Sequence, residues 1–320
     1  MANSNLTDDL PPEFADRVSG ATLKNGRATL VLDASGLEEA EREALERDIT
    51  GRLTARNDVE EVRVVMTAEK SGPLLIAIGS GKGGVGKSTL TANLAIALSR
   101  QGMKVGLVDA DIYGPSQQVI FGTQDAKPEA RDNKLVPVES RFGIPMLSMG
   151  HLVQPGRAIA WRGPMVGNAL SQMIDAHWGN REVILIDLPP GTGDVQLTML
   201  QKYKPAGAVL ISTPQDLALI DAARAGQLFE AAGVPIIGLV ENMAGYACPH
   251  CGEVSDPFGA GGVEAAAERL DLPFLGRIPL DLVIREGSDA GAPPAAGDGD
   301  LAHPFNAIAG KLAEWISAKS

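Results

Sequence analysis

Apolar residues change their pattern along the chain near residue 70. Beyond this point, short uninterrupted apolar runs bounded by turns predict buried strands at 74–78, 105–108, 183–186, 209–211 and 236–240. Helical spacing separates most of these runs, for example where Leu90, Leu94 and Leu98 repeat on one face. Strands that lack polar alternation and are separated by helices indicate a mostly parallel sheet covered by helices on both faces. The sequence therefore predicts an α/β fold for this part of the chain.

The first 70 residues predict a small α+β domain. Residues 27–33 are strand-like, residues 37–54 carry apolar side chains near helical spacing, and residues 59–66 alternate as a second strand does. We therefore expect two domains, at residues 1–70 and 71–320.

Composition excludes several classes of protein. Apolar residues make up 44% and charged residues 21% of the 320 residues, which is typical of a globular protein. The net charge of −12 argues against a nucleic-acid partner, since phosphate backbones are bound by clustered Lys and Arg. No apolar run approaches 18 residues and no secretory signal is visible, so we expect no membrane span and a cytoplasmic location.

A glycine-rich segment follows the first predicted strand of the second domain. Residues 81–88 satisfy G-x-x-x-x-G-K-[ST], the phosphate-binding loop (P-loop) of a P-loop NTPase, in the strand–loop–helix context that this motif requires. Backbone N–H groups of such a loop wrap the phosphates, Lys87 would neutralise the β- and γ-phosphates, and the Ser88 hydroxyl would ligate Mg²⁺. The expected nucleotide-binding residues are Gly81, Lys82, Gly83, Gly84, Val85, Gly86, Lys87, Ser88 and Thr89.

Lys82 adds a second lysine early in this loop. The resulting Lys-Gly-Gly-x-Gly-Lys resembles the deviant P-loop of dimeric ATPases that include MinD, ParA and the nitrogenase iron protein. The resemblance implies an ATP-hydrolysing homodimer in which Lys82 reaches the nucleotide of the partner chain. The spacing of the motif by itself indicates only phosphate binding.

Carboxylates at two later strand ends resemble the switch regions of the same superfamily. Asp109 and Asp111 follow one predicted strand, and the resemblance implies that Asp111 activates the attacking water while Asp109 lies near the metal. Asp187 follows another strand in the manner of a Walker B residue and is implied to hold Mg²⁺ through water. Considered singly, each of these acids could equally be a helix cap or a solvent contact.

Two further residues are implied to contact adenine. Asn242 follows the apolar run at 236–240, at the end of that strand, and Asp281 follows a later strand. The alternative for both residues is a turn at the end of a strand, where Asn and Asp are common.

Both cysteines of the chain lie in one motif, Cys248-Pro-His-Cys251. A redox dithiol is disfavoured, because its first thiol needs a helix N-terminus and the Gly- and Pro-containing segment after Cys251 cannot propagate a helix. A structural zinc ion or a four-iron cluster normally takes four ligands, so a symmetric dimer that apposes two such pairs would complete one shared site. The thiols themselves do not distinguish iron–sulfur from zinc.

These motifs together resemble the Mrp/ApbC iron–sulfur cluster carrier ATPases across residues 72–285. The similar segments are the P-loop and residues 109–116, 161–165, 187–194 and 248–251. The resemblance implies a [4Fe–4S] cluster held by Cys248 and Cys251 of two subunits, received from scaffold donors and delivered to apo-proteins. Residues 1–70 resemble a diverged iron–sulfur assembly domain. We derive no role for Trp161–Met165 beyond packing.

Two other functions compete with this one. A MinD- or ParA-like positioning ATPase with a structural zinc at the cysteine pair would act on a membrane or DNA. The amphipathic segment at 305–316 could serve as its anchor, but few basic residues accompany it and a helix packed on the domain is favoured. A nitrogenase-like electron donor is disfavoured, because the cluster cysteines of that protein lie far apart in sequence.

Overall fold

A computed structural model describes residues 6, 10, 17–34, 37, 39–67, 72–152 and 163–319. Contacts along the chain divide it into two compact units, residues 1–72 and 73–320. Of the predicted segment at 161–165, Trp161 and Arg162 lie outside the described residues, and Gly163 begins a helix.

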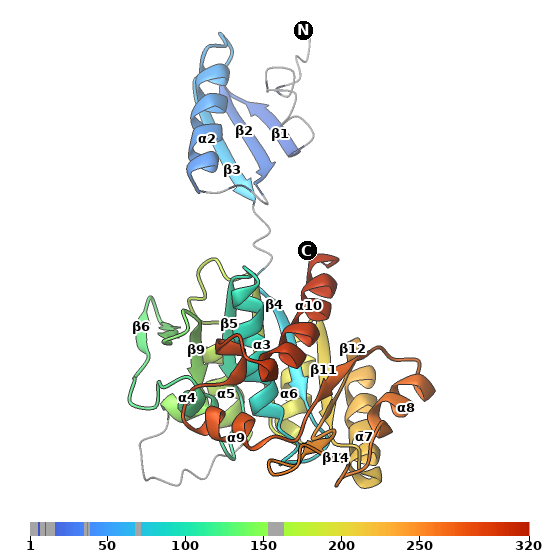
Figure 1. The fold of residues 1–320 in the computed structure, drawn as a ribbon. Helices are drawn as coiled ribbons and strands as arrows, with labels where there is room; N and C mark the ends of the chain where they lie inside the picture. Colours follow the sequence, from blue (N-terminus) through green and yellow to red (C-terminus); the bar gives the residue numbers. More distant parts are fainter. Residues whose placement is uncertain are drawn as a thin grey trace. The chain divides into compact units, whose positions relative to one another are not determined.

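The first unit is a three-stranded sheet with a helix on one face (Figure 1). β1 (Val18–Lys24) runs antiparallel to β2 (Arg27–Asp33), which pairs in parallel with β3 (Glu61–Thr67). The helix α2 (Glu39–Thr54) forms the crossover between the two parallel strands. The unit has a core of its own, to which β2 and α2 contribute Ala28, Leu30, Leu32, Leu45, Ile49 and Leu53.

Two details of this unit differ from the sequence prediction. The strand predicted at 59–66 begins only at Glu61, because Val59 donates its backbone N–H to the Arg56 carbonyl in the turn after α2. β1 was not predicted, since its sequence Val-Ser-Gly-Ala-Thr-Leu-Lys lacks a regular apolar alternation. β1 forms a strand because the tight turn at Asn25–Gly26 brings it alongside β2, with which its backbone pairs.

The second unit contains an eight-stranded sheet in the order β15-β12-β11-β4-β10-β5-β9-β8. Every neighbouring pair is parallel except β8–β9 at one edge, and all five predicted strands are found in the sheet. The strands are β4 (Leu74–Gly79), β5 (Val105–Asp109), β8 (Val138–Glu139), β9 (Pro145–Ser148), β10 (Val183–Asp187), β11 (Gly207–Ser212), β12 (Ile236–Asn242) and β15 (Phe274–Ile278).

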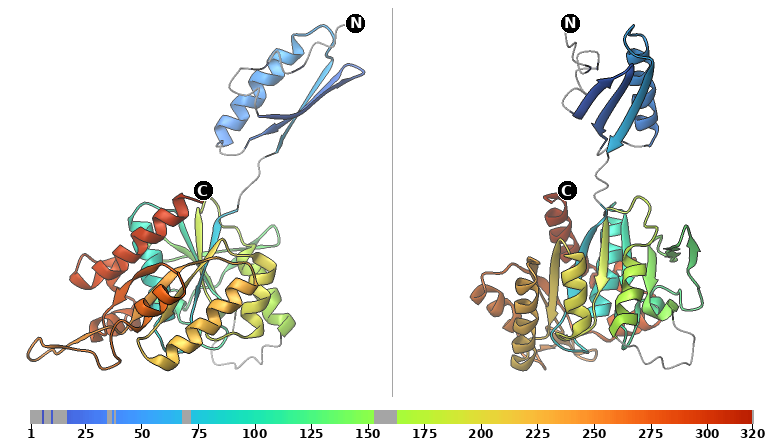
Figure 2. Two further views of the ribbon diagram at one scale, coloured as in Figure 1. Left: turned by 90° about the vertical axis from the view of Figure 1, so that its right-hand side faces the viewer. Right: turned by 180° about the vertical axis from the view of Figure 1, so that it is seen from behind.

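Helices cover both faces of this sheet and enclose two hydrophobic cores, which confirms the predicted α/β architecture (Figure 2). One face carries α3 (Lys87–Arg100), α4 (Gln117–Ile120), α9 (Leu282–Asp289) and α10 (His303–Ser317). The other face carries α5 (Gly163–Ile174), α6 (Asp194–Tyr203), α7 (Asp216–Ala231) and α8 (Gly262–Arg269). The shorter elements are β6 (Glu129–Arg131), β7 (Lys134–Val136), β13 (Tyr246–Ala247), β14 (Val254–Ser255), η2 (Met149–Leu152), η3 (Pro294–Ala296) and η4 (Asp300–Ala302).

The C-terminal helix α10 packs on α3 and β15. Its apolar stripe is buried through Phe305, Ile308, Leu312 and Ile316, as predicted for a helix packed on the domain. Among the residues that the structure describes, no helix is both long and apolar enough to cross a membrane.

The packing of α10 predicts a difference between its two faces. Leu312→Ala should lower the free energy of unfolding by about 2–5 kcal/mol, because it removes fully buried methyl groups and leaves a cavity. Glu314→Ala on the exposed face should change the same free energy by less than about 0.5 kcal/mol. Urea denaturation of both variants measures the difference, and equal effects would mean that α10 does not pack on the domain in solution.

Candidate functional site

The phosphate-binding loop connects β4 to α3 at the carboxyl-terminal edge of the sheet. Gly86 adopts φ +89°, and a Cβ built there would lie 2.1 Å from Asn242 Nδ2, so this position admits no larger residue. A cavity of about 210 Å³ lies over the loop. Its lining brings together most of the predicted loop residues and the predicted Asp111: Ser80, Lys82, Gly83, Gly84, Gly86, Lys87, Ser88, Thr89, Asp111 and Pro190.

Lys87 is buried and pairs with the carboxylate that ends β10. Its Nζ donates to Asp187 Oδ1 and lies 3.7 Å from Asp111 Oδ2 and 3.4 Å from Ser88 Oγ. Thr91 Oγ1 also donates to Asp187 Oδ1, over 3.3 Å. The structure thus brings Lys87, Ser88, Asp111 and Asp187, predicted from three separate segments, to one place.

Asp109 lies next to this group and is fully buried. Its Oδ2 accepts hydrogen bonds from Ser148 Oγ (2.9 Å) and the Gln117 backbone N–H (3.1 Å), and its Oδ1 accepts one from the Asp111 N–H (3.2 Å). Burial, together with the nearby charge of Asp187, raises the pKa of Asp109 from its usual value to about 7. The hydrogen bonds from Ser148 and Gln117 act in the opposite direction but do not offset the burial.

Asp111 begins the turn that follows β5. Its Oδ1 accepts hydrogen bonds from the backbone N–H groups of Tyr113 (3.0 Å) and Gly114 (3.3 Å), which leaves Oδ2 facing Lys87. The carboxylate is therefore held in one orientation at the wall of the 210 Å³ cavity.

Asn242 contacts the phosphate loop directly. Its Nδ2 donates to the Val85 carbonyl over 2.8 Å, immediately before Gly86. Asp281 is the N-cap of α9, where its Oδ1 accepts a hydrogen bond from the Val283 N–H (2.7 Å). The geometry of Asp281 thus corresponds to the turn that was the alternative to an adenine contact.

Lys82 contacts the start of α7 rather than Asn242. Its Nζ is 3.4 Å from Gln215 Oε1, at the start of α7. Gly81 is also close to α7, because a Cβ built there would meet the Asp221 backbone at 2.1 Å. The first residues of the phosphate-binding loop, Gly81 and Lys82, are therefore in contact with α7 and its N-cap residue.

The cysteine pair occupies the turn of a small hairpin formed by β13 and β14, so the prediction that no helix follows it is confirmed. Cys248 is half-buried and Cys251 is exposed, and both are free thiols. The backbone N–H of His250, then the N–H and the thiol of Cys251, hold the pKa of Cys248 below its usual value by favouring the thiolate. Among the described residues, no third His, Cys, Asp or Glu joins this pair to complete a metal site.

Glu241, which lies just before the loop that carries the cysteines, binds residues at or beyond the far end of this loop. Its fully buried carboxylate accepts hydrogen bonds from the N–H groups of Gly261 (3.2 Å) and Val263 (2.9 Å) and from Arg277 Nε (3.0 Å). These contacts hold the two ends of the loop at 243–261 together. Sequence reasoning missed Glu241, because a single Glu next to Asn242 carries no signal of burial.

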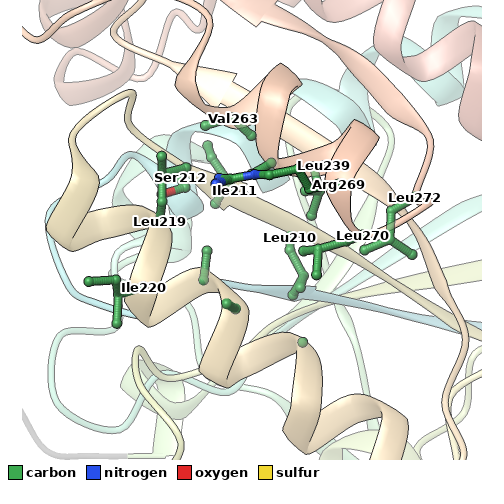
Figure 3. Close-up of a pocket in the computed structure, with 14 residues that line it drawn as sticks. Leu210, Ile211, Ser212, Leu219, Ile220, Leu239, Val263, Arg269, Leu270 and Leu272 are labelled. Atoms are coloured by element: carbon green, nitrogen blue, oxygen red, sulfur yellow. The ribbon is translucent and has the colours of Figure 1, made fainter.

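A second cavity, of about 460 Å³, lies between α7 and α8 over β11 and β12 (Figure 3). Ser212 and Arg269 are the polar side chains among its lining residues, and the remaining lining is apolar or glycine. None of the predicted site residues lines this cavity.

Comparisons with known proteins agree with this geometry. The sequence profile of the ParA family, described as NUBPL iron-transfer P-loop NTPase, matches residues 73–313. An iron–sulfur cluster carrier protein of Pseudomonas fragi is 47% identical over 227 residues, which cover 70% of this chain and 79% of the relative.

Solved structures with the fold of the second unit include the following two. A nucleotide-binding protein of Archaeoglobus fulgidus, in complex with ADP, is 38% identical with a TM-score of 0.63 and covers 72% of this chain and 91% of its own. The septum site-determining protein MinD of Pyrococcus horikoshii, complexed with Mg-ADP, is 27% identical with a TM-score of 0.60 and covers 78% of this chain and 99% of its own.

The raised pKa of Asp109 predicts a pH dependence of stability. Between about pH 4 and pH 7, Asp109 keeps its proton in the folded state but loses it in the unfolded state. The contribution of Asp109 to the free energy of unfolding is therefore full at low pH and is lost as the pH rises towards 7. Without Mg²⁺ and nucleotide, the unfolding free energy of the wild type relative to Asp109→Asn should therefore fall between pH 4 and pH 7. Denaturant titrations at pH 4.5 and pH 8 measure this, and a pH-independent difference would contradict the assignment.

Proposed function

The chain belongs to the ParA family of NUBPL iron-transfer P-loop NTPases, and on that premise we propose that it is an ATP-hydrolysing iron–sulfur cluster carrier. In this proposal, two copies of the chain bind one [4Fe–4S] cluster between them. The cluster is cargo, received from a scaffold protein and delivered to apo-proteins.

One observation carries the proposal: a pair of accessible thiols lies on a hairpin whose base contacts the phosphate loop. Asn242 ends β12 and bonds the Val85 carbonyl, and Cys248 follows only a few residues later. A nucleotide that changes the backbone at Val85–Gly86 therefore acts directly on the base of the cysteine hairpin. This contact supports a coupling between the nucleotide and the cargo.

The nucleotide site supports ATP and Mg²⁺. Ser88, Asp111 and Asp187 offer a hydroxyl and carboxylates, the hard oxygen donors that Mg²⁺ prefers. Gln117, whose Nε2 donates to Asp187 Oδ2, also carries a buried amide oxygen for which the described residues provide no hydrogen-bond partner, as expected where a hydrated cation fits. Bound Mg²⁺ would stabilise the charge that develops on the phosphates.

The chain's own groups have separate tasks in hydrolysis. Phosphate oxygens attract Lys87 away from Asp187, and the left-handed Gly86 lets the loop backbone approach the phosphates closely. Asp111, held by the N–H groups of Tyr113 and Gly114, orients the attacking water. Lys82 extends from the exposed side of the loop to the nucleotide of the second copy.

The cargo site follows from the number of ligands. One chain supplies two thiols, and a four-iron cluster takes four. Two copies related by a two-fold axis that brings the hairpins together supply all four. The lowered pKa of Cys248 favours the thiolate, which is the form that binds iron.

A positioning ATPase with a structural zinc is the second candidate. The likeness to MinD favours it, because that neighbour matches most of this chain. Four thiolates from two copies would suit Zn²⁺ as well. The metal content of the protein separates the two functions.

Removal of one thiol tests the cargo site. Anaerobic reconstitution should give close to four iron and four sulfide per two chains for the wild type. Cys248→Ala should lose nearly all of this content, because only two thiolates would remain in the dimer. His250→Ala is the matched control, since this exposed side chain lies in the same turn and should leave the content unchanged. Iron and sulfide analysis decides, and full content in Cys248→Ala would disprove the cluster site.

The second lysine of the loop is tested separately. Lys82→Ala should keep the Kd for ADP within about threefold but lower the rate of ATP hydrolysis at least about tenfold. The reason is that the Lys82 ammonium is proposed to act on the γ-phosphate bound by the partner chain. Gln215→Ala removes only the contact of Lys82 within the chain and should retain most of the rate. Steady-state phosphate release measures both variants. An unchanged rate in Lys82→Ala would refute the role in trans.

A further inference from the structure

Gln117 is a fully buried amide that does not line the 210 Å³ cavity but contacts two residues of the candidate site, Ser88 and Asp187. It is the first residue of α4, and no sequence motif identified it. Its Nε2 donates to Asp187 Oδ2 over 2.7 Å and to the Ser88 carbonyl over 2.9 Å. Its backbone N–H donates to Asp109 Oδ2 over 3.1 Å. One residue thus joins the ends of β5 and β10 to the first turn of α3.

The orientation of this amide is fixed by its neighbours. The Ser88 carbonyl can only accept a hydrogen bond, and Asp187 Oδ2 accepts one when the carboxylate is ionised beside Lys87. The NH₂ group must therefore face both of them, and the carbonyl oxygen Oε1 is directed elsewhere. Oε1 is buried and has no hydrogen-bond partner among the described residues. Such atoms are uncommon, because an unpaired acceptor loses its water without compensation. The described residues hold five of them, including Oε1 of the neighbouring Gln118, and Gln117 is the one among these five residues that bonds both Ser88 and Asp187.

The missing donor has a natural source. Ser88 and Asp187, which Gln117 contacts, are the residues proposed to face Mg²⁺. Protein-bound Mg²⁺ retains several of its waters, and such waters are strong hydrogen-bond donors. The two oxygens of Asp187 are also divided between partners: Oδ1 serves Lys87 and Thr91, whereas Oδ2 serves Gln117. When Lys87 turns to the phosphates, Gln117 still holds the Asp187 carboxylate in place.

We propose that Gln117 is a positioning residue for Mg²⁺: its NH₂ group orients Asp187, and its Oε1 accepts a hydrogen bond from a water on the metal. This inference rests on the proposed nucleotide function. Loss of outer-sphere partners of this kind typically weakens metal binding 10- to 100-fold.

The test measures metal binding rather than turnover. Mn²⁺ replaces Mg²⁺, and its Kd for the ADP-saturated full-length chain is determined by electron paramagnetic resonance. Gln117→Met keeps the size of the side chain but lacks both polar groups, and Gln117→Asn keeps the amide on a shorter stem. Both should raise the Kd for Mn²⁺ at least tenfold. The Kd for ADP measured in EDTA should stay within about twofold of the wild type.

Gln118→Leu is the control, because it changes the adjacent residue of the same helix, for which the structure records no contact with Asp187 or Ser88. It should leave the Kd for Mn²⁺ unchanged. A folded Gln117 variant with the Mn²⁺ affinity of the wild type would overturn the proposal. Equal losses of Mn²⁺ and of metal-free ADP binding would also overturn it, in favour of a general structural role. If the wild type itself bound no ADP, the proposed function would fail before this inference was reached.

Discussion

Seven parallel strands of the described sheet end at the same edge, and this constraint decides where the chemistry of the second unit lies. The phosphate loop follows β4, Asp109 and Asp187 end β5 and β10, and Asn242 ends β12. Because the strands pair in parallel, residues separated by more than one hundred positions meet without long connecting loops. The cysteine hairpin begins at the same edge, which allows a contact between the nucleotide site and the proposed cargo site.

Charge balance at this edge depends on one lysine. Asp109 and Asp187 are both fully buried, and Lys87 is the buried cation beside them. Lys87 donates directly to Asp187, whereas the hydrogen bonds to Asp109 come from neutral donors. Burial, together with the nearby charge of Asp187, raises the pKa of Asp109 to about 7. In the proposed function, phosphates compete for the same lysine, so nucleotide binding would redistribute charge among these carboxylates. Gln117 bridges both acids, and in our proposal it keeps Asp187 in place while Lys87 changes partner.

The features that could be predicted from the sequence are those that depend on local pattern. Uninterrupted apolar runs predicted the five strands, and the fixed spacing of the loop placed Lys87 and Ser88 at the start of α3. Gln117 and Glu241 were missed, because their burial arises from contacts with segments far away in the chain. Strand β1 was missed as well, because its sequence lacks a regular apolar alternation, and its pairing with β2 makes it a strand. Tertiary contacts, rather than propensity, determine these positions.

The central claim of this account is that each chain carries half of a metal site and that a second copy completes it. Native mass spectrometry of the anaerobically reconstituted protein tests this directly, because it resolves the number of chains and the mass of the inorganic centre in the same ion. The account predicts a species of two chains with one four-iron, four-sulfide cluster, and single chains without a cluster. Single chains that carry an intact cluster would contradict it.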